Sequence, residues 1–358
     1  MDVAEKAGVS KGLVSFVLND RPGVAPATRE RILDAVRELD WRPSQAARSL
    51  INDRAYAMGF VLARPADLLA ADPFFPGFIA GVEAELSARN SALVLQVVPD
   101  VDAELDTYRR LVADKRVDGV LVADLRVDDP RPGALAALGL PAVTLGRPDG
   151  ARVCPAVVLD DAPGVAASVD HLADLGHQRV AFVGGPDDFL HARHRRDAWR
   201  TALEQRGLPR DEQLELDGDF SGDSGATAMA RLLAMDERDR PTAVLFANDL
   251  MAVAAVAEAQ RQACRVPDDI SVVGFDDIAV AAHIHPSLTT VRQDAVAWGR
   301  AATRAVFDQV EHGRASDVEL APARLVIRGS TGPAPARVLG RRRRRTASTI
   351  GTPSKGKQ

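Results

Sequence analysis

Two histidine pairs have the spacing of metal ligands. His191 and His194 stand three residues apart, and His283 and His285 stand two apart. A closed zinc site needs four ligands and commonly includes cysteine thiolates, but neither of the chain's two cysteines neighbours these pairs in the sequence. We therefore expect no metal site and no bound cofactor.

The acidic residues offer no better catalytic centre. Adjacent side chains do not face each other on a helix or a strand, so neighbouring carboxylates do not form a catalytic dyad. The pairs concerned are Asp160-Asp161, Asp187-Asp188, Asp268-Asp269 and Asp276-Asp277. The chain also lacks a glycine-rich phosphate loop and the nucleophile motif G-x-S-x-G. An enzyme is therefore not expected, and a hydrolase-like activity stays only as the alternative.

The composition is typical of a soluble protein with more than one domain. The chain has 358 residues, 46% of them hydrophobic and 27% charged, and no stretch approaches the roughly 18 apolar residues of a membrane span. Two cysteines fit a reducing compartment, and the first residues lack the basic and then apolar pattern of a secretory leader. These features predict a cytoplasmic protein with no membrane partner.

The formal net charge of −5 hides an uneven distribution. Residues 1–54 contain nine basic and eight acidic side chains, and the last 22 residues contain eight basic and none acidic. The remaining residues contain 28 basic and 42 acidic side chains. Because an acidic body masks a weakly basic head and a basic tail, the average does not exclude a nucleic-acid partner.

Short β-branched runs alternate with amphipathic segments from residue 58 to residue 328, which is typical of βα units. Continuous apolar runs fit parallel strands that are buried on both faces. So many strands exceed one ordinary open sheet, so we expect an α/β body of two doubly wound lobes with a cleft between them. The expected strands are Met58–Ala63, Ala92–Val98, Gly119–Ala123, Ala142–Leu145, Ala156–Leu159, Arg179–Val183, Ala243–Ala247, Ile270–Phe275 and Leu325–Ile327.

The first 55 residues contain three helical patterns and no strand. They cover Asp2–Ala7, Lys11–Leu18 and Ala27–Leu39, with Gly8 and Ser10 suited to end the first helix and begin the second. This arrangement predicts a helix-turn-helix. On the second helix the spacing turns the apolar side chains Val14, Val17 and Leu18 inward. It turns Lys11, Gly12, Ser15 and Phe16 outward.

The order and spacing of these pieces resemble the lac/galactose repressor (LacI/GalR) family over residues 1 to 332. In the head the resemblance rests on Asp2–Ser10, Val14-Ser15, Val17–Asn19, Thr28–Arg31, Arg42-Pro43 and Ala46–Leu50. In the body it rests on Asp72–Phe75, Arg116–Gly119, Gly176–Phe182, Ala247–Asp249, Val272–Asp277 and Leu288–Val291.

The resemblance implies a helix-turn-helix domain at 1–43, a hinge helix or linker at 44–55 and a periplasmic-binding-protein-like body at 56–332. Lobe 1 would take about 56–159 and 290–320, and lobe 2 about 160–289 and 321–332. The chain would cross between the lobes near Leu159–Ala162, Leu288–Val291 and Val318–Ala323. Residues 333–358 have a composition that predicts a disordered basic tail.

The family resemblance also implies which residues contact DNA. They are Lys11, Gly12, Ser15, Phe16, Asn19, Thr28, Ala47, Arg48 and Leu50. Phe16 stands where the family usually has arginine, so it would contact a thymine methyl or a sugar, or else pack on a neighbouring helix. Leu50 would wedge between base pairs in the minor groove, or else belong to a plain linker.

In the body the resemblance implies an effector site made of Phe74, Phe75, Arg195, Phe220, Asn248, Asp276 and Gln293. Asp276 would accept hydrogen bonds from the effector and Arg195 would donate them. Other interpretations stay open for some of these residues: Asp276 and Asn248 could cap helices, and Phe74 could belong to the core.

Together these features predict a transcriptional regulator that acts as a repressor. It would bind a pseudo-palindromic operator in double-stranded DNA as a homodimer and respond to a small molecule, a sugar or a related metabolite, in the cleft. The alternative is a sugar-binding protein or a hydrolase-like enzyme built on the same two-lobed body.

Overall fold

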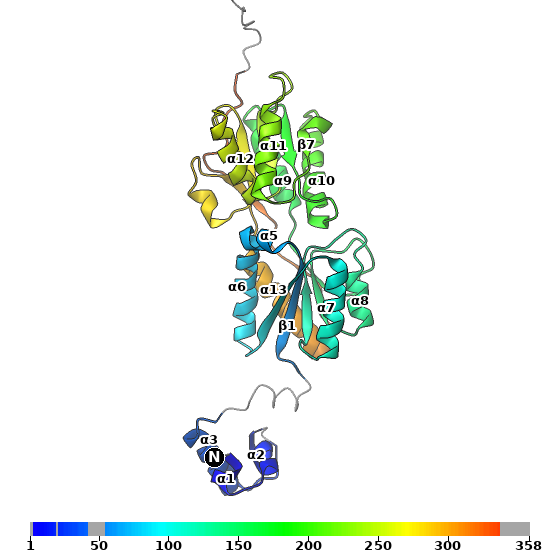
Figure 1. Ribbon diagram of the computed structural model, residues 1–358, viewed down its shortest axis with the longest axis vertical. Helices are drawn as coiled ribbons and strands as arrows, with labels where there is room; N and C mark the ends of the chain where they lie inside the picture. Colours follow the sequence, from blue (N-terminus) through cyan, green and yellow to red (C-terminus); the bar gives the residue numbers. More distant parts are fainter. Residues whose placement is uncertain (1–2, 19–20, 42–53, 337–358) are drawn as a thin grey trace, which may run out of the picture.

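The computed structural model of the protein describes residues 3–18, 21–41 and 54–336 (Figure 1). Four of the expected DNA-contacting residues, Asn19, Ala47, Arg48 and Leu50, lie outside this part of the chain, as do most of the expected hinge and the basic tail beyond Ala336.

The head is a small bundle of three helices. They are α1 (Val3–Ala7), α2 (Lys11–Leu18) and α3 (Pro26–Glu38). Ile32 is fully buried at its centre, and Val3, Val14 and Val17 pack around it. Gly8 ends α1 with a φ of +63°, a conformation that glycine adopts without strain. The Ser10 hydroxyl then accepts a hydrogen bond from the Leu13 amide at 3.3 Å, as expected of the residue that begins α2.

The first lobe is built on a six-stranded sheet in which every strand pair is parallel. The order is β11-β5-β4-β3-β1-β2, with bounds β1 Ala57–Ala63, β2 Ala92–Val98, β3 Gly119–Val122, β4 Ala142–Leu145, β5 Ala156–Val158 and β11 Val318–Glu319. Its helices are α5 (Ala66–Ala71), α6 (Phe74–Ser87), α7 (Val101–Ala113), α8 (Arg131–Ala137) and α13 (Ala295–His312).

The second lobe has its own six-stranded sheet, of order β12-β10-β9-β8-β6-β7. The strands are β6 Val180–Val183, β7 Glu215–Leu216, β8 Ala243–Phe246, β9 Ser271–Asp276, β10 Thr289–Arg292 and β12 Arg324–Val326, the last antiparallel to β10. Its helices are α9 (Ala162–Asp174), α10 (Leu190–Gln205), α11 (Gly222–Leu233) and α12 (Asp249–Arg261). Two 3₁₀ turns cover Glu212–Leu214 and Ala279–Ala282. The expected fold class, a helical head followed by two parallel-sheet lobes, is confirmed.

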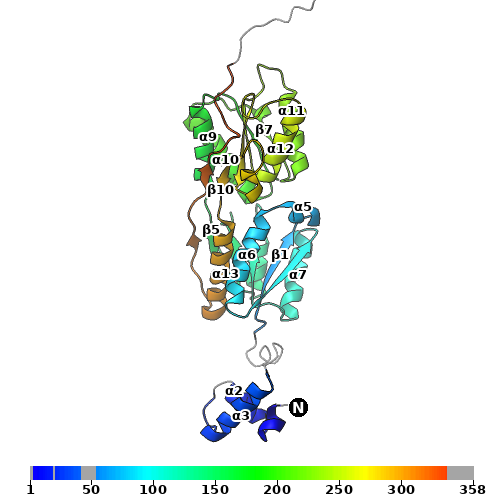
Figure 2. The same ribbon diagram turned by 90° about the vertical axis from the view of Figure 1, so that its left-hand side faces the viewer.

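Three segments carry the chain between the lobes, and one of them lies later than expected. The crossing placed at Leu288–Val291 is wrong, because β10 pairs with β9 from Thr289 to Arg292 and so belongs to the second sheet. The chain crosses after Arg292 and enters α13, which packs beside α6 in the first lobe although it comes late in the sequence (Figures 1 and 2). The other two crossings run side by side: the Leu320 amide donates to the Val158 carbonyl at 2.8 Å.

No helix within the described ranges 3–18, 21–41 and 54–336 is long and apolar enough to cross a membrane.

Helices α6 and α13 approach so closely that glycine is needed on both. A β-carbon on Gly81 would lie 2.1 Å from the Val296 carbonyl oxygen, and one on Gly299 would lie 2.2 Å from the Phe78 carbonyl oxygen. Since both contacts are to backbone, neither helix can yield by a side-chain rotation. The contact holds α13, which follows directly from a crossing segment, against the first lobe.

Replacing Gly81 by alanine therefore forces the two helices apart. We expect Gly81→Ala to lower the free energy of unfolding by about 1–3 kcal/mol, the usual cost of overpacking, measured by urea denaturation. Gly133→Ala is the matched control: Gly133 lies in α8, and a β-carbon there meets no atom within 4 Å. Equal stability of the Gly81 variant and the native protein would show that the helices are not packed this tightly.

Candidate functional site

A cavity lies between the two lobes at the carboxyl ends of the parallel strands, which is where open α/β sheets bind ligands. Six of the seven residues expected to bind an effector line it. The full lining is Arg64, Asp72, Phe74, Ala123, Asp124, Leu145, His191, Arg195, Phe220, Asn248, Asp276, Gln293 and Trp298.

Asp276 lies at the end of β9, where it is half-buried and lines the cavity. Its φ of +118° is a strained value for a residue with a side chain, and this conformation sets the direction of the strand end. The side-chain amide of Gln293 donates a hydrogen bond to Asp276 Oδ1. Burial raises the pKa of Asp276 well above the usual aspartate value, since the charge of Arg195 only partly offsets it. Within the described residues Asp276 accepts no hydrogen bond from a helix amide, so the alternative of a helix cap does not apply.

Arg195 reaches the cavity from α10 and is held on three sides. Its Nε donates to Asp161 Oδ2 and its Nη1 to the Ala247 carbonyl, both at 2.7 Å. Its guanidinium carbon lies 3.6 Å from the centre of the Phe275 ring, which gives a cation–π contact. The planar group is therefore fixed in one orientation, with its remaining edge available for a ligand.

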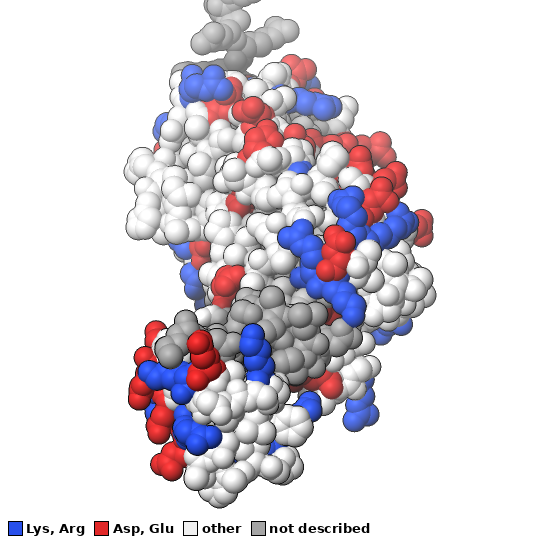
Figure 3. Space-filling model, turned by 60° about the horizontal axis from the view of Figure 1, so that its bottom comes forward, with Lys and Arg blue, Asp and Glu red and all other residues white. Residues whose placement is uncertain are grey.

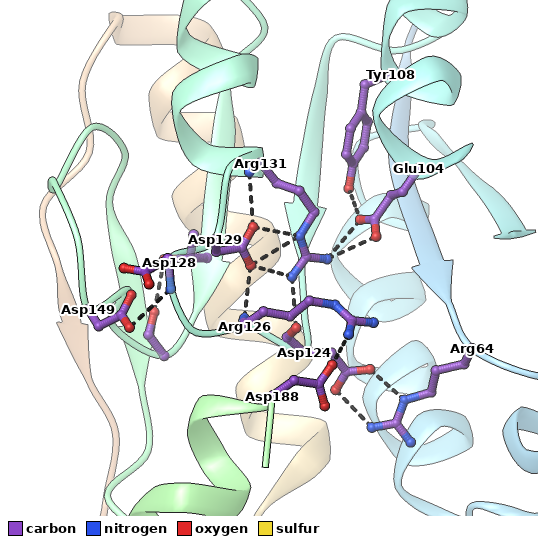
Figure 4. A network of polar contacts seen from close by, with 12 residues as sticks. Arg64, Glu104, Tyr108, Asp124, Arg126, Asp128, Asp129, Arg131, Asp149 and Asp188 are labelled. Atoms are coloured by element: carbon purple, nitrogen blue, oxygen red, sulfur yellow. Dashed lines mark hydrogen bonds and ion pairs between the residues drawn. The ribbon is translucent and has the colours of Figure 1, made fainter. Parts of the chain in front are cut away.

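The opposite wall, from the first lobe, carries a charged cluster that the sequence analysis missed. Arg64 follows β1 and Asp124 follows β3, and they form a two-pronged ion pair, with Nε–Oδ2 at 2.5 Å and Nη2–Oδ1 at 2.9 Å (Figure 4). Asp72 lies 3.4 Å from the same guanidinium. Although burial opposes ionisation, Arg64 holds the pKa of Asp124 below its usual value. Arg64 directly follows β1 and Asp124 is the second residue after β3, positions at strand ends that could have identified them.

The segment that carries Asp124 is held in place by a buried network around Arg131 (Figure 4). Arg131 is 1% exposed and binds both carboxylate oxygens of Glu104, at 2.9 and 3.0 Å. It also donates to Asp129 at 2.6 Å and to the Asp124 carbonyl at 2.7 Å. Tyr108 donates its hydroxyl to Glu104 at 2.6 Å. Every one of these contacts lies within the first lobe, so the backbone at residue 124 is rigid.

Aromatic rings close the cavity. His191 stacks on Phe220 with a centroid distance of 5.4 Å and an interplanar angle of 19°. Burial, aided by the positive charge of Arg195, lowers the pKa of His191 to about 3, so the imidazole is neutral at physiological pH. Phe74 and Trp298 meet edge to face across the first-lobe side, at 6.0 Å.

Two of the residues expected at the effector site, Phe75 and Asn248, have structural roles in the fold. Phe75 does not line the cavity: it is 2% exposed in the first-lobe core, with the Arg64 guanidinium 5.0 Å above its ring, so the expectation of a stacking surface there is wrong. Phe74 and Phe75 are adjacent on α6 and so point in different directions. Asn248 lines the cavity and also caps α12, accepting from the Met251 amide at 2.9 Å. The capping interpretation thus holds for Asn248.

In the head, the residues expected to face DNA from α2 lie on its outer side. Lys11 and Gly12 are exposed, and Ser15 is half-buried. Phe16 is 43% exposed, with the Arg21 guanidinium 5.5 Å from its ring centre, so it does not pack into the head core. Thr28 is half-buried in the first turn of α3. Basic and acidic side chains lie side by side on the head rather than forming one basic face (Figure 3).

Comparison with known proteins finds relatives of both the head and the body of the chain. Residues 1–44 match the family of bacterial regulatory proteins of the lacI type, and residues 169–331 match the periplasmic binding protein-like domain. The regulator CelR of Thermobifida fusca is 37% identical over 91% of this chain and 94% of its own length. The chain belongs to the LacI family. Members of this family are transcriptional regulators with an effector-binding domain and not enzymes.

Further relatives and solved structures agree with this assignment. The repressor PurR of Mannheimia succiniciproducens is 32% identical over 92% of this chain and 97% of its own length. The LacI-family fold is shared with the lac repressor dimer bound to operator and the anti-inducer ONPF, with a TM-score of 0.80 and 29% identity over 92% of this chain and 98% of that one. The complex of CelR with cellobiose gives a TM-score of 0.71 and 35% identity over the same shares.

Ionisation of the Asp276 carboxyl group lowers the stability of the folded protein, and the size of this effect depends on pH. Because its pKa is raised in the folded protein, ionisation opposes folding, and this cost is absent below about pH 4 and grows as the pH rises above the unfolded-state pKa. We expect Asp276→Asn to raise the melting temperature at pH 7 and to change it little near pH 4. Asp106→Asn, at an exposed site on α7, is the control. A lower melting temperature for Asp276→Asn at pH 7 would contradict the assignment.

Proposed function

We propose that this LacI-family regulator binds a pseudo-palindromic operator as a homodimer and that a neutral sugar, bound between the lobes, controls its affinity for DNA. The observation that carries the effector class is the cavity itself. A carboxyl group, a guanidinium and an amide converge there between aromatic rings, and this combination recognises hydroxyl groups by hydrogen bonds and sugar rings by apolar contact.

An unpaired buried acceptor favours a ligand with hydroxyl groups. Gln293 lines the cavity, and its Oε1 is buried and has no hydrogen-bond partner within the described part of the chain. Buried acceptors without donors cost about 1–3 kcal/mol each. A polyol can donate to such acceptors, whereas an apolar ligand leaves them unsatisfied.

The charge balance argues against an anionic effector. Arg64 is already neutralised by Asp124 and Asp72, and Arg195 by Asp161. His191 is neutral, and the raised pKa of Asp276 disfavours the charged form of its carboxyl group. A sugar phosphate or a uronate would therefore meet no unpaired positive charge among the described lining residues. A neutral sugar fits, in line with the cellobiose named in the solved CelR complex.

The effector class can be tested with DNA upstream of the coding sequence, labelled for fluorescence anisotropy. Cellobiose is expected to change the affinity of the native protein for this DNA, and adenine and guanine are expected to leave it unchanged. Asp276→Asn should keep DNA binding and lose the response to cellobiose. If the native protein responded to adenine or guanine and not to cellobiose, the effector would be a nucleobase and the sugar assignment would be wrong.

Lys11 is expected to contact a guanine edge or a phosphate from α2 in the major groove. Lys11→Ala should weaken specific binding about tenfold, within the range of roughly 1–3 kcal/mol for a base contact. Arg37→Ala is the control, because Arg37 is exposed near the end of α3 and paired with Asp34. Leu50→Ala should also weaken specific binding if the hinge bends DNA, and unchanged affinity would refute the hinge.

The homodimer has a candidate surface on the first lobe. Strand β2 lies at the edge of its sheet, and Leu95 and Val97 are each 41% exposed on the same face of it. An unpaired edge with exposed apolar side chains favours a protein partner. A second copy is the partner that a two-fold operator requires.

Charged residues on this edge should therefore separate the dimer. The double change Leu95→Asp and Val97→Asp is expected to give a monomer by light scattering and to reduce operator affinity at least about 100-fold, since each head then binds alone. Val153→Asp is the control, as Val153 is 46% exposed in the loop before β5. A dimer that survives the double change would place the interface elsewhere.

A further inference from the structure

Two backbone segments, one from each lobe, are hydrogen-bonded to each other beside the effector cavity. The Val127 amide in the first lobe donates to the Asp188 carbonyl in the second at 2.9 Å. The Leu190 amide in the second lobe donates to the Leu125 carbonyl in the first at 2.8 Å. Arg126 and Phe189 thereby form an isolated antiparallel β-bridge across the lobe boundary.

Side chains reinforce this contact. Arg126 forms an ion pair with Asp188 (Figure 4), and its guanidinium carbon lies 4.7 Å from the centre of the Phe189 ring. The Arg126 side chain is 22% exposed and that of Asp188 is 52% exposed. Both are thus open to solvent, so the pair can break without exposing a large apolar surface.

We propose that the segments Leu125–Val127 and Asp188–Leu190 form an interlobe clasp whose Arg126–Asp188 pair sets the balance between the joined and separated lobes, and with it the affinities for effector and operator. This inference rests on the proposed function for its regulatory part only. The clasp itself is a property of the contacts between the lobes.

The clasp is well placed to act on the lobes. Leu125 and Leu190 of the clasp line a cavity of about 730 Å³, and so do Leu159, Asp160 and Asp161 of a crossing segment. The clasp therefore joins the lobes at a point other than the covalent connections. Its hydrogen bonds must break before the lobes can separate there.

The clasp is also tied to the effector cavity. Two residues before Arg126, Asp124 lines the cavity, and directly after Leu190, His191 stacks on Phe220. In the first lobe, Asp129 accepts a hydrogen bond from the Arg126 amide at 2.9 Å and is itself held by the buried Arg131. The first-lobe half of the clasp is therefore prearranged, and closing it brings Asp124 and His191 to their places in the cavity wall.

A ligand that touches both lobes stabilises the arrangement in which they are joined. Any change that weakens the clasp must then lower effector affinity, because part of the binding free energy is used to join the lobes. By the same linkage, a weakened clasp must shift operator affinity in the direction opposite to the shift that the bound effector causes. This holds whether the effector releases the protein from DNA or recruits it.

Hydrogen exchange on the full chain tests the clasp without any ligand. The Val127 and Leu190 amides are the donors across the boundary, so Arg126→Asp and Asp188→Arg should each speed exchange in peptides that contain them, by about three- to tenfold. The double variant with both changes restores the ion pair in reverse and should return exchange to within about twofold of native. Arg109→Asp is the matched control, because Arg109 pairs with Asp106 within α7.

The same variants test the regulatory part. Each single change should weaken cellobiose binding about three- to tenfold, the double variant should recover it, and operator affinity without sugar should move opposite to the effect of cellobiose on the native protein. Native exchange in the single variants, or a double variant no better than the singles, overturns the clasp. A shift of operator affinity in the same direction as that caused by cellobiose overturns its regulatory role. If the native protein binds no cellobiose, the sugar assignment fails while the exchange result still decides the clasp.

Discussion

Burial of charge between the lobes is the constraint on which the rest of the site depends. Two buried arginines line the cavity, and each is neutralised within its own lobe: Arg64 by Asp124 and Asp72, and Arg195 by Asp161. Because neither lobe needs the other to balance its arginine, the lobes can move apart without leaving a buried charge unpaired. Asp276 alone among these groups has no ion-pair partner within the described residues, so its interactions are those that a ligand can improve.

Because each lobe balances its own charges, the first lobe needs several buried residues to hold one short segment, Asp124–Arg131, in place. Glu104, Arg131 and Asp129 are buried, and together they fix the backbone from Asp124 to Arg131 by charge-assisted hydrogen bonds. Buried ion networks contribute little net stability compared with apolar packing, but they hold one geometry. The rigid segment then presents a carboxylate to the cavity and an arginine to the opposite lobe. The close glycine contact between α6 and α13 likewise fixes the position of α13, the helix that follows a crossing segment, relative to α6.

The sequence predicted the elements whose burial pattern is simple. All nine expected strands are present, with each end within one residue of the expected position, because most of them are continuous apolar runs. Strand β10 was missed as a strand because its sequence, Thr-Thr-Val-Arg, is largely polar. Thr289 and Thr290 are nevertheless fully buried, since the Thr289 hydroxyl is hydrogen-bonded to the Thr331 hydroxyl and the Thr290 hydroxyl donates to Asp249. That error displaced a lobe boundary.

The site shows the same limit. Family motifs located Asp276 and Arg195, but the Arg64–Asp124 pair joins residues 60 positions apart and depends on strand order, which no local pattern encodes. Phe74 and Phe75 could not be told apart because they are neighbours in the chain, and only the packing of α6 decides which ring meets the cavity. Glu104 looks like a solvent-facing acid on an amphipathic helix, yet it is fully buried against Arg131.

Charge distribution finally limits how such a protein can recognise DNA. The head has nearly equal numbers of basic and acidic side chains, and it carries ion pairs such as Lys6–Glu38 that occupy part of its positive charge. The body is strongly acidic, so long-range attraction to the phosphate backbone is weak. In the proposed homodimer, affinity would then come from short-range contacts of α2 and from joining two heads on one duplex. The distance between the two heads would matter more than in a strongly basic protein, and a change in lobe arrangement that alters this distance would have a large effect on binding.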